Sequence, residues 1–288
     1  MIVHGTPDRR GTRGAGLLVA AIVLVHATAV TASAQPLAGS VSAVGAVNVP
    51  MAERTRPDAE ALRRGAPGLR RADGWKLGAL AAAAALVATA DRRGDAWARR
   101  PGVRDDATLR ALSRVGDASG KYAALGVGPA AWMLGRVRGD SGTAVLGLRT
   151  TEAAVLSVMT IGAIKAIAGR TRPYASADQS PTHWDLLGGI RSDSTRSFAS
   201  GHAAFSAAAA VTLAAEWRRQ GAGGWQTVGP PLVYALASLT AASRVRDRQH
   251  WLSDVVTGSA VGIASALIVR RWHDRHPGGR IDRTFLAR

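Results

Sequence analysis

Three short segments of the sequence combine side chains that are suited to holding and transferring an oxyanion. The last of them, Ser243–Asp254, reads SRVRDRQHWLSD and contains both a histidine and an aspartate beside several arginines. His250 and Asp254 are four positions apart, which would place them on one face of a helix. A carboxylate beside a histidine can hold one imidazole nitrogen and leave the other free to react. Arg244 adds a planar fork of N–H donors that fits an oxyanion.

Two upstream segments supply further groups of the same kind. The first reads KAIAGRTRP, in which Lys165 and Arg172 are two more cations. The second is Ser200-Gly201-His202, directly before an apolar stretch. A serine at a helix start can cap the helix or donate to a phosphate, and a glycine lets an oxyanion approach the free N–H groups there. Each segment alone is compatible with an ordinary helix end, but together they indicate a phosphate site.

The two histidines have different neighbours, and this predicts different roles for them. Only His250 has a carboxylate at helical spacing, so His250, held by Asp254, is expected to attack phosphorus. His202 is expected to protonate the leaving oxygen and then to activate water. The three cations stabilise charge on the phosphoryl group during transfer, so we expect neither a metal nor another cofactor.

The elements that must position these residues have the pattern of helices. Six apolar stretches are rich in Ala, Leu, Val and Gly, and none alternates apolar and polar residues as a strand would. They are Leu77–Ala90, Tyr122–Leu134, Thr143–Ile167, Ala203–Trp217, Leu232–Ala242 and Val255–Val269. We therefore predict an all-α protein, an up-down helical bundle of about six core helices. Alternating helix directions would bring the three segments to one end of this bundle.

The N-terminal region has the composition of a targeting segment followed by a linker. Residues 1–34 resemble a secretory signal peptide: arginines come first, then the apolar stretch Gly16–Val30, then the small-residue cleavage site Ala32–Ala34. The alternative is an uncleaved membrane anchor, and either would send the chain out of the cytoplasm. Residues 35–74 are rich in Pro, Gly and Arg and are expected to form a flexible arm or linker. Residues 273–288 are expected to be a basic tail in solvent, His273 included.

Charge and composition limit the partners of the chain. It contains 37 basic and 20 acidic residues, for a net charge of +17, and no cysteine. The lack of cysteine excludes disulfides, Cys-ligated zinc and thiol catalysis. The arginines are scattered between apolar runs rather than gathered on a basic helix, so we expect no nucleic-acid partner. Anionic lipid headgroups, phosphorylated substrates and a coding bias towards arginine remain as explanations of the charge.

The sequence leaves open how the bundle meets a membrane. Most apolar stretches are shorter than the ~20 residues that a spanning helix needs. Several arginines nevertheless lie together at one end of the predicted bundle, a distribution that matches the positive-inside rule for membrane proteins. A bundle that spans the membrane and a soluble or peripheral bundle both remain possible.

Lys-x6-Arg-Pro, Ser-Gly-His and Ser-Arg-x5-His-x3-Asp together resemble the type 2 phosphatidic acid phosphatase family. That family is similar to bacterial non-specific acid phosphatases and vanadium haloperoxidases, and the resemblance covers about Thr143–Val269. It implies a helical bundle and metal-free hydrolysis through a phosphohistidine. It implies His250 as nucleophile, Asp254 as its orienting partner and His202 as acid and base. The phosphate contacts that it implies are Lys165, Arg172, Ser200, Gly201 and Arg244.

One position departs from the family pattern, because Ala199 stands where a proline usually precedes Ser-Gly-His. The substitution should loosen this turn and reduce activity. The loop Tyr174–Phe198 is expected to form one lip of the pocket, where His183, Trp184, Arg191 and Arg196 are candidate substrate contacts.

The combined prediction is a helical phosphatase domain at residues 75–272 that acts outside the cytoplasm. We place it in the periplasm or the cell-envelope membrane, with the active site facing outward and a membrane surface as partner. The expected substrates are phosphomonoesters or diphosphates, either phosphorylated small molecules or, preferably, lipid phosphates. Two alternatives stay open: a vanadate-dependent haloperoxidase that uses the same pocket, and a non-catalytic envelope protein that binds anionic lipids. The oligomeric state is not predicted.

Overall fold

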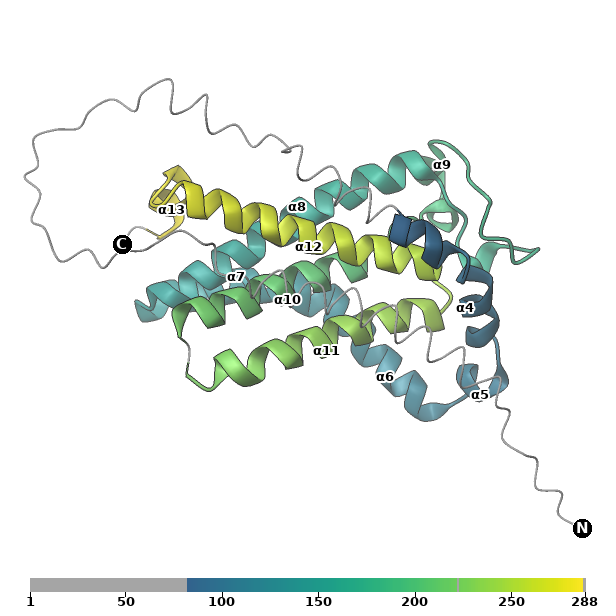
Figure 1. Cartoon of the computed structure of the whole chain (residues 1–288), viewed down its shortest axis with the longest axis horizontal. Helices are drawn as coiled ribbons and strands as arrows, with labels where there is room; N and C mark the ends of the chain where they lie inside the picture. Colours follow the sequence, from purple (N-terminus) through teal and green to yellow (C-terminus); the bar gives the residue numbers. More distant parts are fainter. Residues whose placement is uncertain (1–81, 222, 287–288) are drawn as a thin grey trace, which may run out of the picture.

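The computed structural model describes residues 82–286 except residue 222 (Figure 1). In this part of the chain every regular element is a helix, apart from one isolated bridge between Arg170 and Trp184. The all-α prediction is thus confirmed. The predicted signal peptide at 1–34 and arm at 35–74 lie outside the described residues.

Five long helices form the bundle within the described part of the chain. They are α7 (Ala124–Arg138), α8 (Ser141–Ala168), α10 (Gly201–Gln220), α11 (Trp225–Arg246) and α12 (Leu252–Arg275). Each contains one of the predicted apolar stretches, except that the stretch Tyr122–Leu134 begins two residues before α7. Residues 82–88 of the remaining stretch are also helical. The shorter elements are α4 (Asp91–Ala98), α5 (Pro101–Arg104), α6 (Ala107–Ala118), the π-helical turn η1 (Ser119–Ala123), the 3₁₀ turns η2 (Pro173–Ala175) and η3 (Asp193–Thr195), α9 (Gly188–Arg191) and α13 (Arg280–Leu286).

Helix α10 lies at the centre of the bundle because its buried side chains are small, mostly alanine (Figure 1). Helices α8, α11 and α12 pack around it. Helix α12 approaches it closely: a Cβ at Gly258 would lie 2.2 Å from the carbonyl oxygen of Ser200, and one at Gly262 would lie 2.0 Å from that of Ala204. Only glycine permits this spacing, which presses the start of α12 against the start of α10.

Residues at the helix ends themselves determine where three helices begin or end, close to the three predicted segments. Helix α8 ends at Gly169, whose φ of 58° is the left-handed conformation that glycine adopts without cost. Helix α10 begins after Ser200, whose side chain accepts from the N–H of Ala203. Helix α12 begins where Oδ2 of Asp254 accepts the N–H of Trp251 at 2.9 Å. The positions of these three helix ends are therefore determined by their own sequences.

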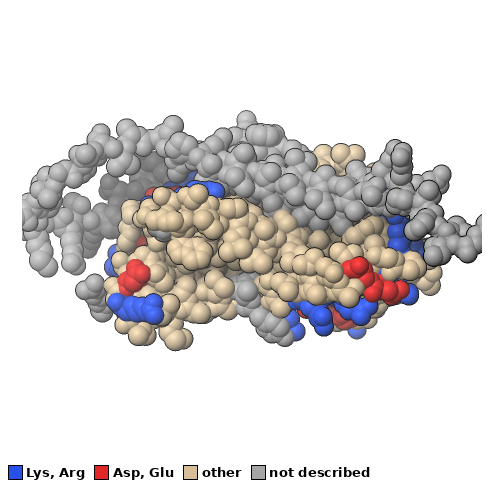
Figure 2. Space-filling view, turned by 90° about the horizontal axis from the view of Figure 1, so that it is seen from below, with Lys and Arg blue, Asp and Glu red and all other residues tan. Residues whose placement is uncertain are grey.

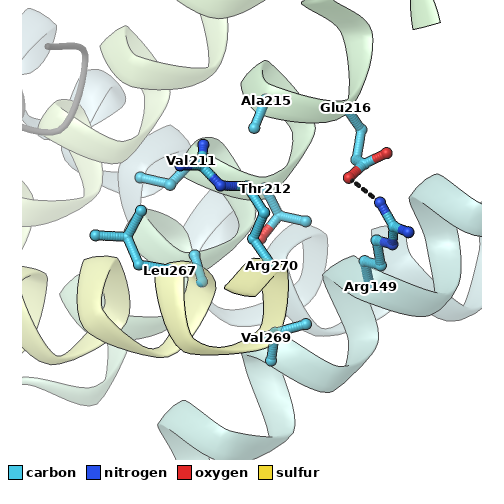
Figure 3. A pocket seen from close by; sticks show the side chains of 9 residues that line it. Arg149, Val211, Thr212, Ala215, Glu216, Leu267, Val269 and Arg270 are labelled. Atoms are coloured by element: carbon cyan, nitrogen blue, oxygen red, sulfur yellow. Dashed lines mark hydrogen bonds and ion pairs between the residues drawn. The ribbon is translucent and has the colours of Figure 1, made fainter. Parts of the chain in front are cut away.

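A buried ion pair links α8 to α10 at the opposite end of the bundle (Figure 3). Nη1 of Arg149 donates to Oε1 of Glu216 at 2.7 Å, and Nη2 of Arg219 lies 3.1 Å from the second carboxylate oxygen. Val269 and Arg270 of α12 line the same small cavity. Both members of the Arg149–Glu216 pair are buried, so neither charge has water as an alternative partner.

The expected basic tail at residues 273–288 is instead part of the bundle as far as residue 286. Helix α12 continues through His273, which is 2% exposed. Nε2 of His273 lies 2.5 Å from Oε2 of Glu152, and Nδ1 lies 3.1 Å from Oδ1 of Asp282 in α13. The prediction was wrong because His273 has charged neighbours in the sequence, a pattern typical of a solvated segment. In the structure, the carboxylates that contact His273 belong to other helices.

Exposed apolar side chains cover parts of the outer surface. Those on α7 and α11 are Leu125, Met133, Leu134, Val137, Trp225, Val228, Leu232 and Leu236. Figure 2 shows a face on which the charged side chains of the described residues gather towards the two ends. Helices α8 and α12 are long and apolar enough to cross a membrane, although α12 is mostly buried in the bundle, as the core helix of a soluble protein is. These features weakly indicate association with a membrane.

Candidate active site

The structure brings the three predicted segments to one end of the bundle. Lys165 lies in the last turn of α8, His202 in the first turn of α10, and Arg244 in the last turn of α11. The N–H of Ser200 donates to the carbonyl oxygen of Asp254 at 2.9 Å, which joins the second segment directly to the third. The first segment joins the third where Nη1 of Arg172 donates to the side chain of Gln249 at 2.9 Å.

His250 lies just before α12, and its proton position follows from its hydrogen bond. Its Nδ1 is 2.6 Å from the carbonyl oxygen of Ser197. A carbonyl only accepts, so the proton is on Nδ1 and Nε2 keeps its lone pair. Burial lowers the pKa of His250 to about 3; the contact with Asp254 offsets this shift only in part, and the charges of Lys165 and Arg172 add to it. The imidazole is therefore neutral and nucleophilic at neutral pH.

Asp254 supports His250 less directly than its spacing predicts. Its Oδ2 lies 3.9 Å from Nδ1 of His250, beyond hydrogen-bond distance. The same oxygen accepts from the hydroxyl of Ser197, whose carbonyl holds the imidazole. The geometry differs from the prediction because α12 begins only at Leu252, so His250 is not on the helix that carries Asp254. Asp254 thus fixes Ser197, and Ser197 fixes the histidine.

Arg170 neutralises Asp254 inside the protein. One guanidinium nitrogen donates to Asp254 and the other donates to Asp91 of α4 at 2.7 Å. Asp91 also accepts from the backbone N–H of Ser253 at 2.8 Å. Burial raises the pKa of Asp91, and the charge of Arg170 partly offsets this. For Asp254 burial also acts to raise the pKa, but the contacts with His250 and Arg170 outweigh it, so the pKa is lowered.

The first two predicted cations are held in place by backbone and side-chain oxygens. Nζ of Lys165 donates to the carbonyl oxygen of Arg196. Burial and the nearby charge of Arg172 lower the pKa of Lys165 to about 7. Nε of Arg172 donates to the carbonyl oxygen of Asp193 at 2.9 Å, which orients its guanidinium. The charges of both cations act on the imidazole of His250 and lower its pKa.

The third cation, Arg244, and the second histidine share a carboxylate that the sequence motifs do not contain. Nη1 of Arg244 is ion-paired with Oδ1 of Asp117, in the last turn of α6. The same oxygen lies 3.5 Å from Nε2 of His202. Burial, followed by the charge of Arg244, lowers the pKa of His202 to about 4. The expectation that only His250 has a neighbouring carboxylate was therefore wrong, because Asp117 approaches from a helix distant in sequence.

The remaining predicted positions, Ser200 and Gly201, and the departure from the family pattern at Ala199 lie at the start of α10. Ser200 is buried and caps α10, and a Cβ at Gly201 would meet no atom closer than 3.4 Å, so packing alone does not require glycine there. Ala199 is buried against Ile161 and Ala204.

The lip residues are mostly engaged within their own loop. His183 lies 3.2 Å from Asp178, and Arg191 is paired with Asp185 at 2.7 Å. Trp184 packs against Phe198. These contacts favour a structural role for the loop side chains.

Sequence reasoning missed Asp91, Asp117, Arg170 and Ser197. Arg170 is within the KAIAGRTRP segment, so the motif placed it near the site but assigned it no role. The other three act through contacts between elements far apart in the chain. Among the residues that the structure describes, no group of three or more His, Asp or Glu side chains is arranged to hold a metal ion.

Two histidines, three cations and a helix N-terminus at one end of a helical bundle form an arrangement that can bind a phosphate group. Residues 147–277 match the family model described as the PAP2 superfamily, which confirms the family resemblance that the motifs predict. The match indicates phosphatase- or haloperoxidase-type activity on a phosphorylated substrate. Neither the curated proteins nor the solved structures contain a significant match to the chain.

Proposed function

We propose that the protein is a metal-independent phosphatase that works through a phosphohistidine on His250. The observation that carries this proposal is the state of that side chain. It is neutral, its proton is fixed on Nδ1 by Ser197, and its Nε2 keeps the lone pair that a nucleophile needs. This is the form in which an imidazole attacks phosphorus.

The proposed reaction has two steps. Lys165, Arg172 and Arg244, with the N–H groups at the start of α10, bind the phosphoryl oxygens and stabilise their charge. Nε2 of His250 forms a bond to phosphorus as the bond to the leaving oxygen breaks, and His202 gives that oxygen a proton. Neutral His202 then takes a proton from water, which attacks the phosphohistidine and releases inorganic phosphate. A bound phosphate anion favours the protonated form of His202, which burial and Arg244 disfavour in the empty site.

The proposed substrates are phosphomonoesters or diphosphates, with lipid phosphates favoured. Support comes from the apolar side chains exposed on α7 and α11 and from the two helices long enough to cross a membrane. We further propose that the protein acts outside the cytoplasm, in the periplasm or cell-envelope membrane, with its active site facing outward. The N-terminal signal in the sequence supports this location.

The test is release of inorganic phosphate from phosphatidic acid, a prenyl diphosphate and p-nitrophenyl phosphate, each assayed with a chelator present. We expect activity that His250→Ala abolishes and that the control His276→Ala, at the far end of α12, leaves unchanged. Activity that survives His250→Ala, or that requires an added divalent metal, would contradict the mechanism. Halide oxidation with vanadate and peroxide, in place of phosphate release, would favour the haloperoxidase alternative.

A further inference from the structure

Asp117 lies inside the proposed site although it belongs to none of the three motifs and precedes the region matched by the PAP2 superfamily. Its Oδ1 is ion-paired with Nη1 of Arg244 and lies 3.5 Å from Nε2 of His202. The carboxylate therefore sits between a cation assigned to the phosphate and the histidine assigned to the leaving oxygen. Its side chain is 41% exposed, so the carboxylate is accessible from solvent.

The backbone of α6 is fixed firmly enough to hold Asp117 in this position. Gly116 packs against α11 so closely that a Cβ there would lie 2.6 Å from the carbonyl oxygen of Leu239. Thr240 of α11 donates to the carbonyl oxygen of Gly116 at 2.8 Å. One turn earlier, Ser113 donates to Asp247 at 2.7 Å. These contacts with α11 and with Asp247 at its end anchor the last turn of α6 beside the site.

Asp117 has the opposite charge to the other ionised groups that act on His202. The groups that act on His202 are the cations Arg244 of α11, Lys165 of α8 and Lys121 of η1, together with the carboxylate of Asp117 from α6. The cations attract every phosphate substrate alike. A carboxylate beside the leaving-group histidine does not act alike on all substrates, because it repels a leaving group that is itself an anion. It has no such effect on a leaving group that departs as a neutral alcohol.

We propose that Asp117 is a specificity-determining residue that selects phosphomonoesters of neutral alcohols over diphosphates. This inference rests on the proposed phosphatase function and resolves which of its two substrate classes the site prefers. In a monoester, the bond that breaks releases an alcohol, which takes its proton from His202. In a diphosphate, attack on the terminal phosphorus releases a phosphate monoester, whose charge must pass Asp117. Substrate of either kind displaces Asp117 from Arg244, so its carboxylate is then left facing the leaving group.

The test compares farnesyl phosphate with farnesyl diphosphate, which share one hydrocarbon chain and differ in the charge of the leaving group. Full-length wild-type protein should have the higher kcat/KM on the monophosphate. Asp117→Asn should shift the ratio of the two kcat/KM values towards the diphosphate by about tenfold, which corresponds to about 1.4 kcal/mol. Asp117→Ala should shift it in the same direction. The control Asp105→Asn removes one negative charge from an exposed position next to α6 and should leave the ratio unchanged.

Two results would overturn the assignment. One is a ratio that neither Asp117 variant moves. The other is an equal loss of activity on both substrates with unchanged thermal melting, since Asp117 would then serve His202 in every reaction. Failure of the proposed function is distinguishable: the wild-type protein would release phosphate from neither substrate, and the specificity assignment would fall with it.

Discussion

Replacing Arg170 by methionine tests the buried charge network behind His250. Arg170 is the cation that joins Asp91 and Asp254, which are 1% and 0% exposed. Removing one partner of a buried ion pair costs about 3–5 kcal/mol, and this change leaves two carboxylates without their cation, so we expect the upper end of that range. In a domain of this size 1 kcal/mol lowers the melting temperature by about 2–4 °C, so Arg170→Met should lower it by about 10–20 °C at neutral pH.

The loss of stability in Arg170→Met should depend on pH. In the wild type, contacts with Arg170 and His250 lower the pKa of Asp254, which adds stability above the unfolded-state pKa. Without Arg170, burial raises the pKa of both carboxylates above their unfolded values, and stability then decreases as the pH rises through this window. The difference between wild type and variant should therefore be largest near pH 7 and should shrink as the pH falls to about 4, close to the ordinary pKa of an aspartate in water.

The measurement is thermal and urea unfolding of the two proteins at neutral and at acidic pH. The control is Arg191→Met, which removes an ion pair with Asp185 whose side chains are 65% and 55% exposed. Exposed pairs contribute about 0–1 kcal/mol, so this variant should melt close to the wild type. An Arg170→Met protein that melts like the control, or that loses the same stability at both pH values, would refute the buried network.

Two further predictions concern single charges. Because the pKa of Lys165 is about 7, kcat/KM should fall as the pH rises above 7, and Lys165→Arg, which stays charged, should move this fall to higher pH in a pH–rate profile; an unmoved profile would show that another group titrates. Glu216→Gln should leave the buried Arg149 without its counter-charge and lower the free energy of unfolding by about 3 kcal/mol in urea titrations, and a change below about 1 kcal/mol would mean that water reaches the pair.

The helices of the bundle were predictable because their signals are local. An apolar stretch rich in alanine and leucine predicts a helix wherever it lies, and Ser200 before such a stretch predicts a helix start. Once helices alternate in direction, Lys165, His202 and Arg244 must lie at one end of the bundle. These parts of the prediction depend on chain order and helix polarity alone.

The partners of the site residues were not predictable because they depend on packing between distant elements. Asp91 reaches Arg170 from α4, and Asp117 reaches Arg244 from α6, and neither contact has a sequence spacing that identifies it. The hydrogen bond of His250 goes to a backbone carbonyl, that of Ser197, and every residue type carries one. Helical spacing to Asp254 suggested a side-chain partner, but the helix begins two residues after the histidine.

Trapping of the phosphorylated enzyme tests the central claim most directly. Full-length protein is mixed with a phosphate ester in the presence of a chelator, quenched under alkaline conditions that preserve phosphohistidine, and digested for mass spectrometry. We predict covalent phosphate on the peptide that contains His250, and none in the His250→Ala protein, which should also release no inorganic phosphate. Continued phosphate release by His250→Ala, or phosphate trapped on a different residue, would contradict the account.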